Sequence, residues 1–343
     1  MRTLENHYRD IRQNCGYDSI DFDVGELPAS YLGRKFAAVD GRETVANATD
    51  DATIVTTGVG MTGPPHLGTL GQILTAIELQ EQGVDVQLVV ADLEVYHGGG
   101  DLERVTGLAE RYRDFILDLG FDTDRGRLRT QEESHDVMHS GHLLARYYDP
   151  DDGGYFPDSE PTEWEQAVSD MYDGIDPEDD ITGPTSDAAG THSIVLHLTD
   201  FLHPLLKQDY EQVVIMLGID EHGLTVGTRN FLRDTDFDGT VAGLHTRMIP
   251  GTGEYPKMSK SIPDSVVDVT MDCETIRRRI VSFDDEYDRP AESVVFQMMA
   301  LASTYSPEKL EAMRERCAEG GETCERARAE YADHVADLAE KWE

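Results

Sequence analysis

Residues 51–91, DATIVTTGVGMTGPPHLGTLGQILTAIELQEQGVDVQLVVA, decide the fold. The β-branched run 51–57 predicts a strand, and the Gly/Pro-rich segment after it predicts a turn. Apolar side chains then recur at mostly helical spacing, which predicts a helix over 70–81. The run 84–91 is nearly continuous in its apolar half, as is typical of a strand buried in a parallel sheet. Strand, helix and strand in this order predict a parallel α/β sheet.

The chain downstream of this unit continues the α/β pattern and then becomes helical. The pattern predicts one further strand, 212–217, and these helices: 102–119, 134–148, 194–206, 274–281, 291–304, 307–318 and 323–342. Between them, residues 149–190 are rich in Asp, Gly and Pro, with a helical pattern only at 164–172. We expect that stretch to be an exposed acidic insertion. An α/β domain followed by a helical C-terminal domain is therefore predicted.

Charge is the extreme feature of the composition. The chain carries 29 Lys and Arg against 68 Asp and Glu, for a net charge of −39, and the acids are dispersed along it. Such like charge opposes compaction in dilute salt and is largely screened at molar salt. We therefore expect a protein from a halophile with a salt-rich cytoplasm. The balance also argues against a basic DNA-binding domain, although a local basic patch for RNA is compatible with it.

Several other classes of protein are disfavoured. The four cysteines fit neither a disulfide framework nor a zinc spacing, so we expect thiols in a reducing compartment and no metal site. No apolar run approaches the ~18 residues of a membrane span. The polar N-terminus lacks the apolar region of a secretory signal. These features predict a cytoplasmic protein without a membrane partner.

Two segments are placed where a parallel α/β sheet binds ligands. Gly63-Pro-Pro-His66-Leu-Gly68-Thr69 lies between a strand and a helix. Glycine there lets the backbone approach a ligand, and the helix N-terminus offers free N–H groups to phosphate, to which His66 could add a donor. Gly218-Ile-Asp220-Glu221 follows the strand 212–217, at the end where ligands sit in open sheets. Asp220 suits a pair of ribose hydroxyls, or else a turn or a helix cap.

The third segment is Lys257-Met258-Ser259-Lys260-Ser261, preceded by a Gly-rich stretch. It holds two of only six lysines in the chain. Paired ammonium groups on a mobile loop can neutralise the charge that develops in phosphoryl or nucleotidyl transfer.

Together these segments resemble the class I aminoacyl-tRNA synthetases. Residues 63–69 resemble the HIGH signature of that family, and residues 257–261 match its KMSKS signature. The tryptophanyl/tyrosyl branch is the most similar, through 57–63 and Ala91-Asp92-Leu93-Glu94-Val-Tyr96. Two further phrases favour the tryptophanyl side, namely Pro263-x-Ser265 after KMSKS and Gly218-Ile-Asp220 followed by Thr228-Arg229, and so does Tyr31-Leu-Gly-Arg34. The resemblance extends over about residues 30–343.

The resemblance implies a domain organisation and an activity. An N-terminal segment, 1–50, would precede a Rossmann-like nucleotide-binding and catalytic domain, 51–263, which contains the insertion 149–190 and the KMSKS loop, 257–261. Residues 264–343 would form a helical domain that binds the tRNA anticodon. The implied reaction is ATP-dependent activation of an amino acid to its aminoacyl-adenylate, followed by transfer to tRNA. ATP and Mg²⁺ are the implied cofactors, and the branch is usually a homodimer.

The resemblance also assigns roles to individual residues. The catalytic residues would be His66, Thr69, Lys257 and Lys260. The ATP-binding residues would be Gly58, Gly63, His66, Gly68, Thr69, Gly218, Asp220, Glu221, Lys257, Met258, Ser259 and Lys260. The amino-acid-binding residues would be Thr56, Asp92, Asp200 and His203.

Some positions depart from the pattern of the family. Thr69 replaces the last histidine of HIGH, which the branch tolerates, and Glu221 stands where glutamine is usual. Thr56 stands where the branch has a tyrosine that lines the amino-acid pocket. The Pro263-x-Ser265 and Tyr31–Arg34 phrases still favour tryptophan as the substrate, while Thr56 leaves alternatives open. One is a tyrosine–tRNA ligase or a paralog that adenylates another amino acid, and another is a non-catalytic nucleotide-binding regulator.

The dispersed acidic charge predicts that folding requires salt. Circular dichroism between about 0.1 M and about 3 M KCl should show cooperative loss of structure at the low end, where the Debye length grows from about 3 Å to about 10 Å. An unchanged spectrum and an unchanged melting temperature at low salt would contradict this expectation.

Overall fold

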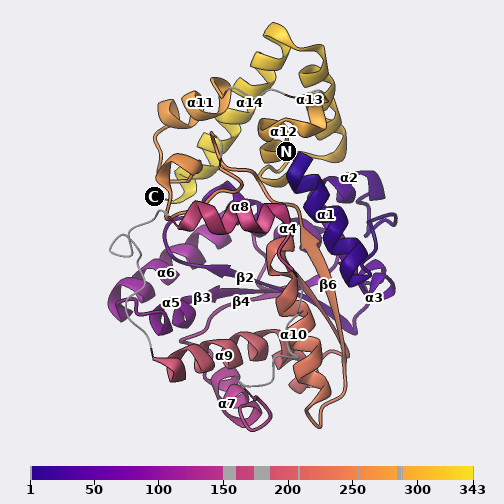
Figure 1. Cartoon of the computed structure of the whole chain (residues 1–343), viewed down its shortest axis with the longest axis vertical. Coiled ribbons are helices and arrows are strands. Elements are labelled where there is room, and N and C mark those ends of the chain that lie inside the picture. Colours follow the sequence, from indigo (N-terminus) through magenta and orange to yellow (C-terminus); the bar gives the residue numbers. More distant parts are fainter. Residues whose placement is uncertain are drawn as a thin grey trace.

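The computed structural model describes residues 2–149, 160–173, 186–207, 209–253, 255–283, 287 and 289–342 (Figure 1). At its centre lies a six-stranded sheet in the order β1-β6-β5-β2-β3-β4. The strands are β1 (Phe36–Asp40), β2 (Thr53–Gly60), β3 (Asp85–Ala91), β4 (Gly126–Thr130), β5 (Gln212–Gly218) and β6 (Thr240–Thr246).

The sheet is mainly parallel, as predicted, but it is a mixed sheet. Strands β2 to β6 pair in parallel, whereas β1 pairs antiparallel with β6. The strand predictions at 51–57, 84–91 and 212–217 agree with β2, β3 and β5, the apolar centre of the sheet. Strands β1, β4 and β6 were not predicted. In β4 the sequence Gly-Arg-Leu-Arg-Thr is charged, because that strand lies at an edge of the sheet.

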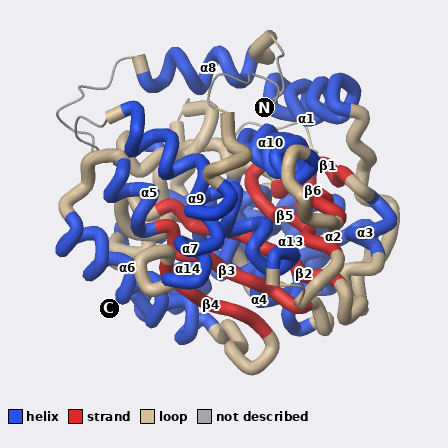
Figure 2. Tube along the Cα trace, turned by 90° about the horizontal axis from the view of Figure 1, so that it is seen from below, coloured by secondary structure: helices blue, strands red, loops and turns tan. Residues whose placement is uncertain are grey.

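Alternate residues of the central strands enter two separate cores. Val214 and Met216 of β5 face the core formed with α4 (Leu67–Glu81) and α6 (Leu102–Leu119). Val213 and Ile215 face the core formed with α9 (Asp187–Leu206) and α10 (His222–Arg233). This two-residue alternation places helices on both faces of the sheet, as Figure 2 shows.

The remaining helices cover the periphery. At the N-terminal side lie α1 (Arg2–Cys15), α2 (Ala29–Lys35) and α3 (Arg42–Ala46), so residues 1–50 contribute helices as well as β1. The others are α5 (Asp92–His97), α7 (His135–Leu144), α8 (Glu163–Tyr172), α11 (Cys273–Val281), α12 (Val294–Leu301), α13 (Pro307–Glu319) and α14 (Gly321–Ala339). The helix expected over 291–304 is interrupted, because the Ser293 hydroxyl accepts from Phe296 N–H and starts α12 there.

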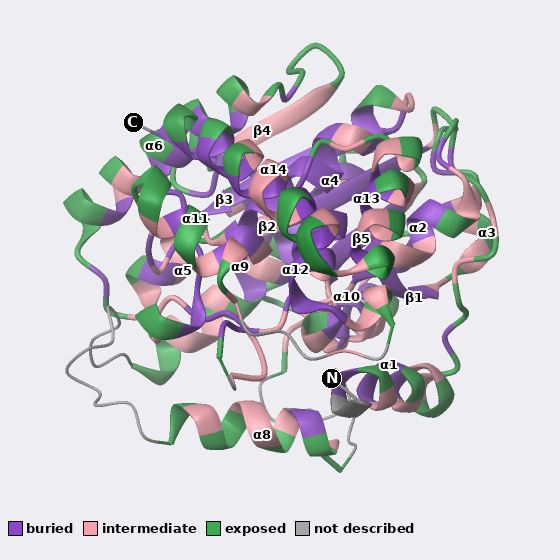
Figure 3. Ribbon diagram, turned by 90° about the horizontal axis from the view of Figure 1, so that it is seen from above, coloured by how far each residue is buried: buried purple, intermediate pink, exposed green. Residues whose placement is uncertain are grey.

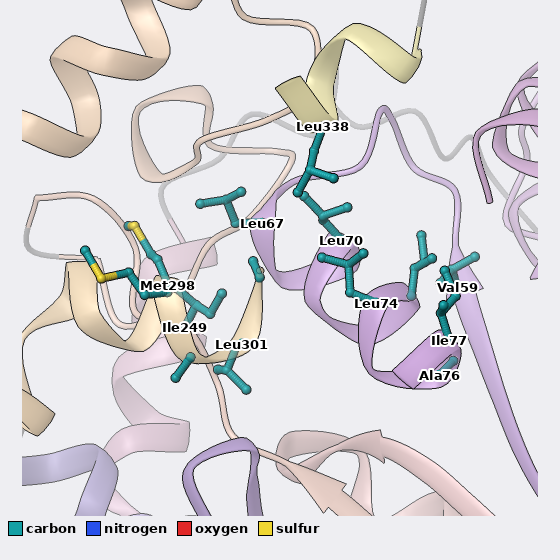
Figure 4. Close-up of a cluster of buried hydrophobic side chains, with 14 of the residues drawn as sticks. Val59, Leu67, Leu70, Leu74, Ala76, Ile77, Ile249, Met298, Leu301 and Leu338 are labelled. Carbon is teal, nitrogen blue, oxygen red and sulfur yellow. The ribbon is translucent and has the colours of Figure 1, made fainter. Parts of the chain in front are cut away.

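The C-terminal helices pack directly on the α4 side of the sheet (Figure 4). Leu70 and Leu74 of α4 lie beside Leu301 of α12 and Leu338 of α14. Gly71 permits this approach, because a Cβ atom there would lie 2.8 Å from the carbonyl oxygen of Leu301. A buried ion pair, Lys35 Nζ to Glu78 Oε2 at 3.0 Å, also fastens α2 to α4.

The predicted acidic insertion, 149–190, lies partly outside the described residues. Its described helix α8 begins at Thr162 with a capping box formed with Glu165, and its Trp164 is 3% exposed. The expectation of an exposed insertion is therefore wrong for this indole, which packs against α1. Figure 3 shows α8 and α1 as neighbours on one side of the molecule. Among the described residues, no helix is both long and apolar enough to cross a membrane.

Candidate functional site

The candidate site is a pocket at the carboxyl ends of the parallel strands. From β2 the chain runs outward to β3 and β4 on one side and to β5 and β6 on the other, so the strand order reverses between β2 and β5. A ligand crevice is expected at such a reversal. The pocket there has a volume of about 340 Å³. Its lining comprises Gly58, Gly60, Thr62, His66, Gly68, Thr69, Gln72, Ala91, Glu94, Tyr172, His197, Leu217, Gly218, Asp220, Glu221, Thr246, Arg247, Met248, Ile249, Lys257, Met258, Ser259 and Lys260.

His66 forms the N-cap of α4 through its side chain. Its Nδ1 atom accepts hydrogen bonds from the backbone N–H groups of Gly68 and Thr69, at 3.0 and 3.3 Å. Burial, with the nearby Lys260 and Lys257, lowers the pKa of His66 to about 3. The imidazole is therefore neutral at physiological pH, and its proton is on Nε2 because Nδ1 is an acceptor. Gly68 is required at this turn, since a Cβ atom there would lie 2.8 Å from the His66 ring.

The two lysines of the KMSKS loop reach the pocket with different partners. Lys257 Nζ lies 2.9 Å from Asp220 Oδ2, and this carboxylate raises the pKa of Lys257 although burial opposes it. Lys260 Nζ donates to the Gly60 carbonyl at 2.9 Å and to the Tyr112 hydroxyl at 3.0 Å. In the described part of the chain no carboxylate pairs with Lys260, and burial lowers its pKa to about 8.

A buried serine supports the KMSKS loop from beneath. The Ser265 hydroxyl accepts from Ser259 N–H at 2.9 Å and donates to the carbonyl of Ile262 at 2.8 Å. Thr252 N–H donates to the Ser265 carbonyl at 2.9 Å, which ties the segment before the loop to the segment after it. These bonds hold residues 257–261 against the mouth of the pocket.

Two glutamates, Glu94 and Glu221, line the same pocket as the lysines. The Glu221 side chain is exposed to solvent, but the walls of the pocket desolvate its carboxyl group in part. The carboxylates of Asp220 and Glu94 lie near it. The partial desolvation and the two carboxylates raise the pKa of Glu221 above its usual range. The Glu94 carboxylate lies 3.8 Å from His197 Nδ1. The pocket therefore contains both ammonium and carboxylate groups, with Asp220 and Glu221 near Lys257.

The structure brings together most of the residues assigned to ATP, since all of them except Gly63 line the pocket. Gly63 lies just outside, where its carbonyl accepts from the Tyr112 hydroxyl at 2.8 Å. A Cβ atom on Gly63 would lie 3.6 Å from Lys260 Cδ. The backbone of Gly63 therefore remains next to the KMSKS lysine.

None of the four residues assigned to the amino acid lines this pocket. Thr56 is fully buried and accepts from Gln87 Nε2 at 2.9 Å. Asp200 forms an ion pair with Arg129 at 2.7 Å and accepts from Gln131 at 2.7 Å. In this arrangement both polar groups are satisfied within the protein.

The other two amino-acid assignments are likewise engaged by protein groups. The Asp92 carboxylate accepts from the backbone N–H groups of Gln131, at 2.8 Å, and Glu132, at 3.1 Å, and so fixes the turn after β4. His203 Nε2 lies 3.0 Å from Asp136 Oδ2, an interaction between α9 and α7.

Sequence reasoning assigned no role to several lining residues. Glu94 follows Asp92 by two positions in the quoted phrase 91–96, and that proximity was the available signal. Gln72 lies one turn into α4 and donates to Thr57 and Gly58, at 2.7 and 2.9 Å. Tyr172 ends the helical pattern expected at 164–172, and His197 lies in the helix expected over 194–206, but no chemical motif marked either side chain. Among the described residues, no three His, Cys, Asp or Glu side chains gather as a metal site.

Comparison with known proteins agrees with this geometry. The family described as tRNA synthetases class I (W and Y) matches residues 48–162. A tryptophan–tRNA ligase of Methanopyrus kandleri is 26% identical and aligns with 99% of this chain and 91% of its own length.

Solved synthetase structures share this fold, including these two. The tryptophanyl-tRNA synthetase of Encephalitozoon cuniculi bound to tryptophan superposes with a TM-score of 0.72 at 15% identity, over 98% of this chain and 92% of its own. The tyrosyl-tRNA synthetase of Archaeoglobus fulgidus complexed with L-tyrosine superposes with a TM-score of 0.66 at 18% identity, over 91% and 97%.

The helix cap made by His66 predicts a separation between two substitutions. His66→Ala removes the acceptor for two N–H groups and should lower the free energy of unfolding by about 1 kcal/mol. His66→Asn keeps a capping oxygen and should retain most of that stability. Urea unfolding at constant high KCl measures both. Equal destabilisation by alanine and asparagine would show that the ring does not act as a cap.

Proposed function

Since the chain belongs to the class I aminoacyl-tRNA synthetases of the tryptophanyl/tyrosyl group, we propose that it is a tryptophan–tRNA ligase that activates tryptophan with ATP. The observation that carries the proposal is the pocket at the strand reversal, which both KMSKS lysines line together with the N-terminus of α4. Tryptophan is proposed because the relative that aligns over nearly the whole chain is a tryptophan–tRNA ligase.

The chemistry requires no protein nucleophile. The amino-acid carboxylate attacks the α-phosphorus of ATP, the bond to the bridging oxygen breaks, and pyrophosphate leaves with the electron pair. Catalysis is then a matter of in-line positioning and of stabilising the charge on the leaving group. The Nε2–H of His66 and the N–H groups at the start of α4 are suited to phosphate oxygens.

The lysines would serve different oxygens. Lys260 has carbonyl and phenol partners, so its charge is available to pyrophosphate. Lys257 forms an ion pair with Asp220. When the nucleotide binds, Asp220 would accept hydrogen bonds from the ribose hydroxyls in place of the one from Lys257. Mg²⁺ would neutralise phosphate charge, and it would arrive bound to ATP, since no three His, Cys, Asp or Glu side chains of the described residues gather as a metal site.

The amino acid would lie near Glu94 and Glu221. Both carboxylates line the pocket, and either could receive an α-ammonium group. An indole that reaches β2 would meet the hydrogen bonds that Gln87 donates to Thr56 and to the Asp200 carbonyl. These hydrogen bonds would have to break, or one of these groups would have to accept the indole N–H. A polar amino acid is therefore the second candidate, and the Thr56 network is what favours it.

We further propose that the second substrate is tRNA, contacted by the helices from α11 onward, and that the protein acts as a homodimer in the cytoplasm. These proposals rest on the family and on the position of the helices beside the catalytic sheet. Gel-filtration mass at high KCl tests the dimer.

Amino-acid-dependent ATP–pyrophosphate exchange, screened over all twenty amino acids at high KCl, tests the function. Tryptophan should give the highest rate, and aminoacylation of tRNA should follow. A pocket that hydrogen-bonds its substrate can reject an analogue without that group by about 10⁴-fold, so a true substrate should stand out clearly. A higher rate with another amino acid would overturn tryptophan and leave adenylation intact, whereas no exchange with any of them would overturn the enzyme.

Lys260 predicts a specific kinetic signature. Because its ammonium group meets charge that develops in the transition state, Lys260→Ala should lower kcat of exchange by about 10²–10³ while the KM for ATP changes little. In the wild type, kcat/KM for ATP should fall as pH rises through about 8, where the free Lys260 ammonium loses its proton.

The matched control for this titration is Lys260→Arg, whose guanidinium stays charged. Its kcat/KM for ATP should show no decline around pH 8, whatever its absolute value. A decline that persists unchanged in the arginine variant would assign the titration to another group.

A further inference from the structure

Helix α8 runs along the outer side of the KMSKS loop and touches it at two points. Trp164 Nε1 donates to the carbonyl of Pro256 at 3.3 Å, and the Tyr172 hydroxyl donates to Ser259 Oγ at 3.0 Å. Pro256 precedes the first lysine of the loop, and Ser259 lies between its two lysines. The contacts therefore flank Lys257.

The spacing of the contacts is consistent with a helix laid alongside an extended loop. The eight steps of helix from Trp164 to Tyr172 rise about 12 Å. The three steps of chain from Pro256 to Ser259 span up to about 10 Å when extended. The helix and the loop run in the same direction, because Trp164 contacts Pro256 and the later Tyr172 contacts the later Ser259.

Helix α8 is itself attached to the body of the protein. The Trp164 ring stacks on His7 of α1 at a centroid distance of 4.6 Å, and His7 Nδ1 hydrogen-bonds Thr162 Oγ1 at 2.9 Å. From α1, the Tyr8 hydroxyl accepts from Met248 N–H at 2.8 Å. Met248 lines the pocket directly after β6, so the attachment ends at the sheet.

We propose that α8 positions the KMSKS loop for catalysis, with Tyr172 and Trp164 as positioning residues. Ser265 holds the loop from beneath, and α8 holds it from outside, so that the lysines point into the pocket. Tyr172 acts through Ser259 rather than on the reacting atoms. The effect on catalysis rests on the proposed function, whereas the effect on the loop does not.

Hydrogen–deuterium exchange of the whole protein at high KCl tests the effect on the loop directly. The amides of Ser259, Ile262 and Ser265 are hydrogen-bonded within it. In Tyr172→Phe, which removes only the hydroxyl, a peptide covering 256–265 should exchange about 2–10-fold faster, the factor expected from one neutral hydrogen bond. The β3 peptide should exchange as in the wild type.

A matched control is Tyr210→Phe, which removes a hydroxyl that donates to Asp85 at 3.0 Å, away from the loop. It should leave exchange at 256–265 unchanged. Unchanged exchange at 256–265 in Tyr172→Phe would overturn the proposal. So would equal acceleration in β3, since the hydroxyl would then serve global stability alone.

A double-mutant cycle extends the test to catalysis. Tyr172→Phe should lower kcat/KM for ATP by about 2–10-fold, and the double variant with Ser259→Ala should be no worse than Ser259→Ala alone. Additive effects would mean that Tyr172 does not act through Ser259, which would overturn the proposal. Absence of exchange activity in the wild type would defeat the proposed function while the amide measurements still judge the role of α8.

Discussion

The parallel pairing of β2 with β5 is the constraint on which the site depends. Thr53 to Thr56 pair in register with Gln212 to Ile215, which lie nearly half the chain away in sequence. This ladder brings the glycines at the end of β2 near Gly218, which ends β5, and Asp220, which follows it. The α4 N-terminus follows β2, and the KMSKS loop follows β6 on the other side of β5. A shift of one residue in this register would turn the apolar side chains of both strands to the wrong face.

The central elements were predictable because burial leaves a strong mark on sequence. Strands β2, β3 and β5 are buried on both faces and read as apolar runs, and α4 follows with helical spacing. Strand β4 was not predicted, because it lies at an exposed edge of the sheet, where arginines are tolerated. Strand β1 was not predicted, because it pairs only with β6 and the N-terminal segment. Long-range pairing decides such strands, and local pattern does not record it.

Most of the residues that the sequence assigned to ATP line one pocket, whereas those that it assigned to the amino acid do not. Glycines, the capping histidine and the lysines lie in short contiguous segments, so each motif carries its own geometry. Asp92 and Asp200 were chosen for their chemistry, but folding joins them to Gln131 and Arg129 from another part of the chain. Tyr172 shows the same limit, since its partner Ser259 is remote in sequence and nothing near Tyr172 indicates it.

The two loop lysines show how a strongly acidic chain retains a usable positive charge. Lys257 is neutralised in part by Asp220, and a single ion pair of this kind fixes the direction of the side chain. Lys260 is held by uncharged groups, a carbonyl and a phenol, which orient the ammonium without cancelling it. Burial disfavours the charged form of Lys260, and an anion that enters the pocket would favour it again.

The way in which the two edge strands, β1 and β4, are covered affects the solubility of the protein. Where salt screens the repulsion between molecules, an acidic surface no longer keeps exposed strand edges apart, and edge-to-edge aggregation becomes the hazard. On β1, the outward backbone groups of Val39 bond to Asp18, and the Ala37 carbonyl accepts from Arg12. On β4, Arg127 and Arg129 make the short outer strand a poor template for a second chain. Protection against aggregation thus resides in backbone pairing and side-chain obstruction, which concentrated salt leaves in place.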